Sequence, residues 1–215
     1  GFIMAHRPAV LALQQAHIPG LEISFLRPST GKKFWEESFL YPQVGFTVAA
    51  FDLGSPDYLG QGFAVYPFIN FPLHPTADWN LYFRYGMGLG WITKTFNTTD
   101  RIKNGAIGSH LNGILHFDFH TEKKLNSQSL ITAGVGLTHY SNGSTATPNL
   151  GINIPNAHLG YIHYFGEQQA HVRPQEDLVT KKGRLEAYIA GAFKKIYPPL
   201  GKSYPAGTFS IARMQ

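Results

Sequence analysis

The chain has 215 residues, including 23 glycines and 14 prolines, and it carries a formal net charge of +5. Only 14% of its residues are charged, while 14% are aromatic and 43% are hydrophobic, whereas a soluble domain usually carries about 25% charged residues. Few charges combined with many aromatic residues and glycines exclude a coiled coil, a disordered tail and an ordinary soluble helical enzyme.

The sequence also lacks features that define other classes of protein. It has no cysteine, which excludes disulfide scaffolds, thiol nucleophiles and zinc–thiolate sites. It has no uninterrupted run of about 18 apolar residues, so no transmembrane helix is expected. Its basic residues are spread along the chain rather than gathered in one stripe, and we therefore expect no nucleic-acid partner.

A period-two alternation of apolar and polar residues, typical of β-strands, recurs along nearly the whole chain. In chain order it predicts about ten strands, at residues 4–13, 21–27, 44–52, 59–71, 79–93, 107–120, 131–141, 157–165, 185–197 and 207–213. Turn-forming stretches such as 54–57 and 97–100 separate them. No boundary between domains is visible, so we expect one all-β domain spanning residues 1–215.

The segment 79–93 indicates which way the apolar faces point. One face carries large apolar side chains: Trp79, Leu81, Phe83, Tyr85, Met87, Leu89 and Trp91. The other has one charge and three glycines in seven positions: Asn80, Tyr82, Arg84, Gly86, Gly88, Gly90 and Ile92. A soluble barrel or sandwich would cover that second face with charges. A membrane barrel instead turns its apolar face to lipid, and glycines inside leave room for inward tyrosine and arginine. The sequence therefore favours a transmembrane antiparallel β-barrel.

Aromatic residues near the expected strand ends support this interpretation, because membrane barrels carry aromatic girdles at both interfaces. These residues are Tyr41, Phe71, Trp79, Phe96, Tyr140, Tyr197 and Tyr204.

The expected lumen is polar and crowded. Four residues of segment 107–120 share the lumen face: His110, His116, Asp118 and His120. Residues two apart on one strand face lie about 7 Å apart, so neighbours could share a metal only with help from other strands. We expect a hydrogen-bonded lumen with no metal or other cofactor. Four bulky residues are also expected to point inward: Tyr58, Tyr66, Tyr82 and Arg84. They would crowd a barrel this narrow, which disfavours a small channel.

The segment 131–141 departs from the rule that its outer face is apolar. This face ends in two polar residues, His139 and Ser141. Residues two apart on a strand lie side by side, so the imidazole could take the proton of the hydroxyl. A hydrolase whose nucleophile faces lipid would act on a lipid. The alternative is that both residues lie in the headgroup zone, where polar side chains are expected.

Residues 139–153 read HYSNGSTATPNLGIN, in which His-x-Ser-Asn is followed by Pro-Asn-x-Gly-Ile. This run resembles the signature of the PagL-type lipid A 3-O-deacylases, which are eight-stranded outer-membrane barrels. The strand order fits the family over residues 1–165, with the motif on the seventh strand and 157–165 as the eighth.

The resemblance implies a serine hydrolase that needs no cofactor. Ser141 is the implied nucleophile, and His139 is the implied general base, which then protonates the leaving sugar hydroxyl. Asn142, with nearby backbone N–H groups, is the implied oxyanion stabiliser, unless it serves only as a turn residue. Asn149 and Gly151 are expected to shape the loop.

Asn153 stands where the family places an acidic residue. An amide oxygen can hold the imidazole in the right tautomer, but it offers no charge to stabilise the imidazolium. Reduced activity, a different orienting residue and an inactive member all remain open. Of two other carboxylates, Glu167 is a candidate partner of the imidazole, whereas Asp118 is expected in the lumen.

Three basic residues flank one loop on the side of the motif: Lys94, Arg101 and Lys103. We hypothesise that they contact the phosphates of lipid A, because lysine and arginine suit phosphate oxygens. The alternative is that they are solvated loop charges.

Residues 166–215 extend beyond the family-like part, with a basic linker from Glu167 to Arg184 and two further strands, the last running into Gln215. Single-chain bacterial barrels have even strand counts, so we expect ten strands, in a larger barrel or in a chain truncated at its C-terminus.

The sequence thus predicts a bacterial outer-membrane enzyme that removes an ester-linked acyl chain from lipid A or a related glycolipid. Its expected partners are lipopolysaccharide and membrane lipid. The alternative, favoured by Asn153, is a non-catalytic barrel with a structural or ligand-binding role. The acyl chain and the oligomeric state stay open.

Overall fold

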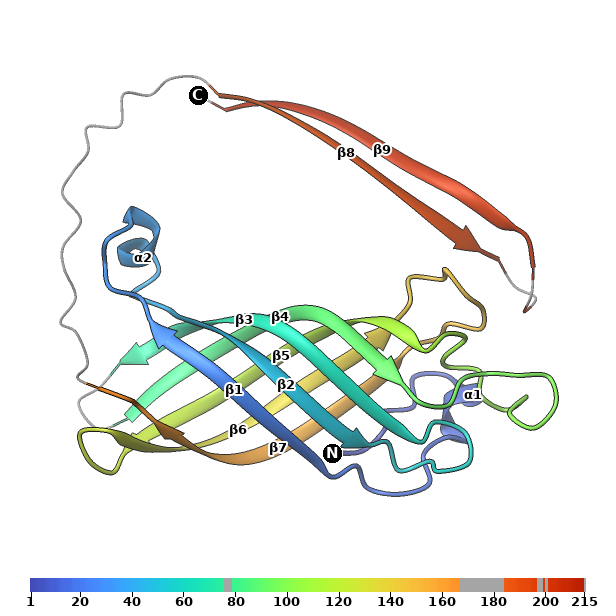
Figure 1. Cartoon of the computed structure of the whole chain (residues 1–215), viewed down its shortest axis with the longest axis horizontal. Coiled ribbons are helices and arrows are strands. Elements are labelled where there is room, and N and C mark those ends of the chain that lie inside the picture. The colour runs from blue at the N-terminus through green and yellow to red at the C-terminus, as the bar shows by residue number, and fades with distance from the viewer. Residues whose placement is uncertain (76–78, 167–183, 197–198, 200, 215) are drawn as a thin grey trace.

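The computed structural model describes residues 1–75, 79–166, 184–196, 199 and 201–214. This part of the chain contains two short helices, α1 (Pro8–Leu11) and α2 (Phe34–Ser38). Its strands are β1 (Gly20–Pro28), β2 (Gln43–Asp52), β3 (Gln61–Pro75), β4 (Trp79–Ile92), β5 (Leu111–Lys124), β6 (Ser129–Ser141), β7 (Ile152–His163), β8 (Arg184–Lys195) and β9 (Ser203–Met214). Strands β1 to β7 pair antiparallel in chain order, and β8 pairs with β9 in a separate hairpin (Figure 1). The predicted all-β antiparallel fold class is confirmed.

The seven-stranded sheet is curled into a trough, with β1 and β7 at its two edges (Figure 1). Its strands are tilted and alternate in direction, so the connections fall at two ends. The N-terminal segment (residues 1–19) and the loops 53–60, 93–110 and 142–151 lie at one end, which we call the motif end. Most of the expected linker, 167–183, lies outside the described residues, as do Glu167, Tyr197 and Gln215.

The N-terminal segment corrects one prediction. Residues 4–13 do not form a strand, and Pro8 instead begins helix α1. The buried residues here are Val10 and Leu13, which lie three apart as on a helical turn rather than two apart as on a strand face. The His-x-Ser motif therefore lies on the sixth strand, β6, and the following strand is the seventh.

The outer, convex face of the sheet is apolar and exposed, as the sequence predicted. In β4 the exposed fractions of Met87 and Leu89 are both 57%, and in β6 that of Val135 is 59%. The alternate residues of the same strands face the concave side, where Tyr82 and Tyr140 are buried. Tyr140 therefore does not belong to an outer aromatic girdle.

The glycines of β4 make room for inward aromatic rings. A Cβ atom added at Gly90 would lie 2.5 Å from Cε1 of Tyr140, and one at Gly86 would lie 2.6 Å from Cδ2 of Tyr66. Real Cβ atoms do not approach that closely, so no larger residue fits at either position without moving a ring. This close packing explains the row of small residues on an otherwise bulky strand.

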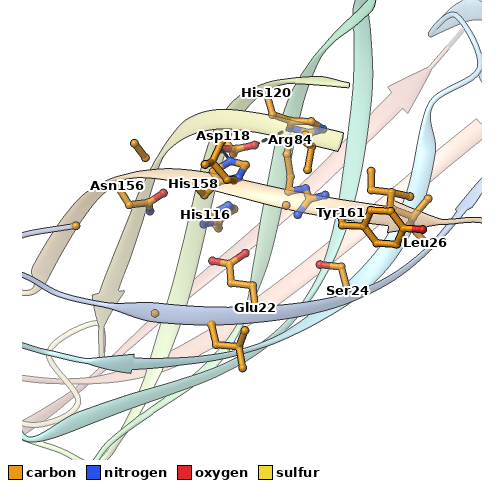
Figure 2. Close-up of a pocket in the computed structure, with 18 of the residues that line it drawn as sticks. Glu22, Ser24, Leu26, Arg84, His116, Asp118, His120, Asn156, His158 and Tyr161 are labelled. Carbon is orange, nitrogen blue, oxygen red and sulfur yellow. Dashed lines mark hydrogen bonds and ion pairs between the residues drawn. The ribbon is translucent and has the colours of Figure 1, made fainter. Parts of the chain in front are cut away.

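The concave side holds a polar network (Figure 2). The side chain of Asp118 is bound by His120 Nδ1 over 2.6 Å and by His158 Nε2 over 2.7 Å. His116 Nδ1 lies 2.9 Å from the hydroxyl of Thr138. Figure 2 shows His116, Asp118 and His158 on the side opposite Glu22 of β1. These residues line a cavity of about 620 Å³ to which β1 and β7 both contribute. Among the described residues, no group of three or more His, Asp or Glu is placed to hold a metal ion.

An apolar core fills the concave side at the motif end. The N-terminal segment contributes Ile3, Val10, Leu13 and Ile18, and the strands and loops around it contribute Leu53, Leu59, Ile92, Ile107, Ile152 and Ile154. Each of these side chains is almost fully buried. Their burial anchors the N-terminal segment against β7, beside the motif.

No helix of the described part is long and apolar enough to cross a membrane.

Candidate active site

The His-x-Ser motif occupies the end of β6, where the strand reaches the motif end of the sheet. His139 and Ser141 share the outer face with Val135, and both are half-buried. β6 pairs with β5 on one side and with β7 on the other, so its course is fixed by two ladders. The motif thus lies on a rigid element whose outer face is apolar.

Asn153 lies directly opposite His139 in the β6–β7 pair. His139 Nδ1 and Asn153 Oδ1 are 2.7 Å apart. An amide oxygen can only accept a hydrogen bond, so Nδ1 carries a proton, and in the neutral imidazole Nε2 then keeps its lone pair. This is the tautomer that a general base requires.

β7 begins earlier than the sequence predicted, at Ile152 instead of residue 157. This part of the strand was not predicted because it contains residues that are rare in strands, namely Asn153, Pro155 and Asn156. Proline is tolerated because residue 155 turns its backbone polar groups away from β6, toward the N-terminal segment, where its carbonyl accepts from Phe2 N over 3.3 Å. The early start of β7 is what brings Asn153 to His139.

Gly151 packs against the imidazole of His139. Its φ angle is +76°, and a Cβ atom there would lie 2.8 Å from Cε1 of His139. The backbone conformation and the close approach both require glycine. Its N–H donates to the carbonyl of Ala106 over 3.1 Å, which ties the 142–151 loop to the 93–110 loop.

The hydroxyl of Ser141 is reached by two donors from the 142–151 loop. Asn149 Nδ2 donates to Ser141 Oγ over 2.9 Å, and the backbone N–H of Gly143 donates to it over 3.2 Å. Among the described hydrogen bonds none joins this hydroxyl to His139, and catalytic hydrogen bonds of this kind often tighten only when substrate is bound. The loop therefore presents two N–H groups to the hydroxyl of Ser141.

The side chain of Asn142 does not lie against Ser141, although the two residues are adjacent in the sequence. Its side-chain Nδ2 donates to Ser109 Oγ over 2.8 Å, and its backbone N–H donates to Asn149 Oδ1 over 3.1 Å. The residue is buried, with its side chain directed into the 93–110 loop. Asn149 and Gly143, rather than the Asn142 side chain, lie against Ser141.

A residue that the sequence did not indicate completes the site. Asn153 Nδ2 lies 3.2 Å from His6 Nδ1, and His6 Nε2 lies 3.0 Å from the carbonyl oxygen of Leu150. Gly143 was not named by the sequence analysis, which expected only that backbone N–H groups near Asn142 take part, although the Asn-Gly turn directly after Ser141 could have indicated it. No local pattern could have indicated His6, since the chain between it and Asn153 spans most of the sheet.

The basic loop residues lie at the motif end, and two of them are held by the fold. Lys94 Nζ donates to the carbonyl of Pro56 over 2.6 Å. Arg101 pairs with Asp100 over 2.9 Å and donates from Nε to the carbonyl of Thr95 over 2.9 Å. Lys103 is exposed.

Asp118 does not take the place of Asn153 beside His139. Asp118 is bound to two histidines on the concave side of the sheet, whereas His139 lies on the convex side. Glu167 lies outside the described residues.

Comparison with known proteins identifies the family. The family model of the lipid A 3-O-deacylases (PagL) matches residues 20–162, which include the motif and all of β1 to β6. No curated protein and no solved structure matches the chain. The matched range covers more than half of the sequence, and it contains His139, Ser141 and Asn153. The chain therefore belongs to the lipid A 3-O-deacylase (PagL) family.

Proposed function

We propose that the protein is an outer-membrane serine hydrolase that removes an ester-linked acyl chain from lipid A or a related glycolipid. The observation that carries this proposal is the 2.7 Å hydrogen bond from His139 to Asn153, next to Ser141 on the same outer face. It gives the imidazole the tautomer of a general base, beside a hydroxyl nucleophile. Family membership supplies the class of substrate.

The outer face supports a membrane-embedded substrate. The apolar row of β6 that includes Val135 leads directly to His139 and Ser141. In a membrane barrel such a row contacts the acyl chains of the bilayer, so the pair at its end lies near the headgroups. The ester bonds of a glycolipid lie at that depth, and its acyl chains can remain in the bilayer during the reaction.

The chemistry follows from these positions. Ser141 Oγ attacks the ester carbonyl carbon while its proton passes to His139 Nε2. The tetrahedral intermediate then expels the sugar oxygen, which takes that proton and leaves as a hydroxyl. Water, deprotonated by His139, attacks the acyl-enzyme and releases a carboxylic acid and free Ser141.

The oxyanion of the intermediate needs N–H donors beside the attacked carbon. The backbone N–H of Gly143 and the side-chain N–H of Asn149 already converge on Ser141 Oγ, and we assign them this role. Donors of this kind usually provide the largest single contribution to acyl transfer. In this proposal Gly143 and Asn149, rather than the Asn142 side chain, stabilise the oxyanion.

The second candidate is a non-catalytic barrel that binds lipid or serves a structural role. Asn153 favours it, because a neutral amide does not stabilise the imidazolium that forms during proton transfer. Among the described hydrogen bonds there is also none between Ser141 and His139. The proposal therefore predicts slow turnover rather than none.

The deciding experiment is mass spectrometry of lipid A after incubation with the detergent-folded protein. Loss of one acyl chain with the parent and with Ser144→Ala, but not with Ser141→Ala, is expected. Ser144 is a matched control because it is a serine of the same loop whose hydroxyl has no assigned role. An unchanged spectrum with all three folded proteins would favour the non-catalytic barrel.

We retain the hypothesis that Lys94, Arg101 and Lys103 contact substrate phosphates. Of the three, Lys103 extends from the loop without an assigned contact, whereas Lys94 and Arg101 would have to exchange loop contacts for phosphate oxygens. The triple glutamine variant should lose its preference for phosphorylated over dephosphorylated lipid A. An unchanged preference would eliminate this hypothesis.

A further inference from the structure

The N-terminal segment forms part of the candidate active site. Met4 N donates to the carbonyl of Asn153 over 2.9 Å, so the segment pairs with β7 at the catalytic amide itself. Ile3 is 1% exposed and Val10 is fully buried, which anchors the segment on both sides of His6. His6 is exposed, yet its backbone is held in place next to Asn153.

Three hydrogen bonds connect the Leu150 carbonyl through His6 and Asn153 to His139. Each bond determines which group is the donor in the next. The Leu150 carbonyl can only accept, so His6 Nε2 carries a proton. In a neutral imidazole Nδ1 is then an acceptor, and it receives the N–H of Asn153 Nδ2. The amide consequently turns Oδ1 toward His139, whose Nδ1 must donate.

This orientation matters because the orienting residue is an amide. A carboxylate offers an acceptor oxygen to the imidazole whichever way it is rotated. An amide rotated by half a turn would present its NH₂ group to His139 Nδ1 and would favour the other tautomer. Nε2 would then carry the proton and could not accept one from Ser141.

We propose that His6 is a positioning residue that fixes the orientation of the Asn153 amide and, through it, the base tautomer of His139. This inference rests on the proposed function for its catalytic meaning. The Asn153 amide takes the place of the family's acid only together with this second histidine. No other described side chain is hydrogen bonded to the NH₂ group of Asn153.

Two variants of His6 separate hydrogen bonding from shape. His6→Phe keeps a planar ring and removes both hydrogen bonds. His6→Gln retains an acceptor for Asn153 and a donor for the Leu150 carbonyl, so it should keep the Asn153 amide in its parent orientation. His17→Phe is the matched control, because His17 is another exposed histidine of the same segment.

The first measurement is the tautomer of His139 in ¹⁵N-labelled, detergent-folded protein without substrate, read by NMR and assigned through His139→Gln. The Nδ1–H form is expected in the parent, in His6→Gln and in His17→Phe, with a shift toward Nε2–H in His6→Phe. An unchanged tautomer in folded His6→Phe would overturn the proposal.

The second measurement is kcat for deacylation in two backgrounds. His6→Phe should lower kcat about tenfold, the equivalent of one hydrogen bond, with Asn153 present and leave KM near its parent value. In the Asn153→Asp background the same change should have little effect, because a carboxylate needs no such orientation. Equal losses in the two backgrounds would overturn the proposal. A parent that is inactive but shows the expected tautomer shift would support the role of His6 and contradict the proposed function.

Discussion

Asn153 lies directly across the β6–β7 pair from His139 and accepts a hydrogen bond from its Nδ1 over 2.7 Å. The geometry of a base and its orienting residue is therefore complete, while the charge is missing. In the proposed mechanism the position of the orienting residue and its charge make separable contributions, and Asn153 supplies only the position.

Restoring the charge should accelerate the reaction. Asn153→Asp is expected to raise kcat about tenfold, because a charge-assisted hydrogen bond stabilises the imidazolium by roughly 1.5 kcal/mol more than a neutral one. Asn153→Leu should abolish turnover. Rates of acyl release from lipid A would measure both effects. In a Ser141→Ala background neither change should alter the rate, and a slower Asn153→Asp enzyme would contradict the assignment.

Gly151 should be intolerant of any side chain. Gly151→Ala introduces a Cβ atom 2.8 Å from His139 Cε1 at a φ of +76°, so the imidazole must move and kcat should fall by about 10². Gly166→Ala is the control, since Gly166 has a φ of +94° with no atom within 4 Å of the added carbon. Both variants should lose about 1 kcal/mol of stability from backbone strain. Thermal unfolding and kcat, measured together, separate the two effects. Equal activity in the two variants would show that the contact with the imidazole is unimportant.

The two asparagines of the 142–151 loop should behave differently. Asn149→Ala removes the donor to Ser141 and should lower kcat by about 10² with little change in KM. Asn142→Ala removes the bond to Ser109 and should mainly reduce stability, by about 1–2 kcal/mol. Steady-state kinetics and thermal unfolding test both variants. A larger kcat loss for Asn142→Ala would return the oxyanion role to that residue.

A charged residue on the apolar convex face should lower the folding stability in a membrane. Val135→Lys places a cation at the middle of β6 on this face and should cost about 2–4 kcal/mol of folding free energy in phospholipid vesicles. Ile102→Lys is the control, because Ile102 is 66% exposed but belongs to the 93–110 loop. Reversible denaturation in vesicles would report the difference. Similar costs for the two variants would argue that the convex face does not contact lipid.

Much of the sheet could be predicted from the sequence because its two faces differ so strongly in side-chain size. In β4, large apolar residues alternate with glycines, and Gly86 packs against Tyr66, which was expected to point inward, whereas the packing of Gly90 against Tyr140 was not foreseen. The motif on β6 was equally visible, since His139 and Ser141 interrupt an apolar row.

What could not be predicted depends on long-range pairing and loop conformation. The contact between His6 and Asn153 joins residues 147 apart in the sequence, and no local periodicity reports such a contact. Residues 4–13 resembled a strand, but Pro8 and the buried Val10 belong to a helical turn. Loop conformation, rather than proximity to Ser141 in the sequence, directs the side chain of Asn149 instead of Asn142 to the hydroxyl of Ser141.

The pairing of the N-terminal segment with β7 also limits where that strand can associate with other chains. Phe2 and Met4 bind the carbonyls of Pro155 and Asn153, on the side of β7 that faces away from β6. An exposed strand edge is a template for intermolecular β-pairing and aggregation. Here the N-terminal segment covers that edge next to His139 and Ser141. Strand addition by another molecule would therefore have to occur nearer the His163 end of β7, away from His139 and Ser141.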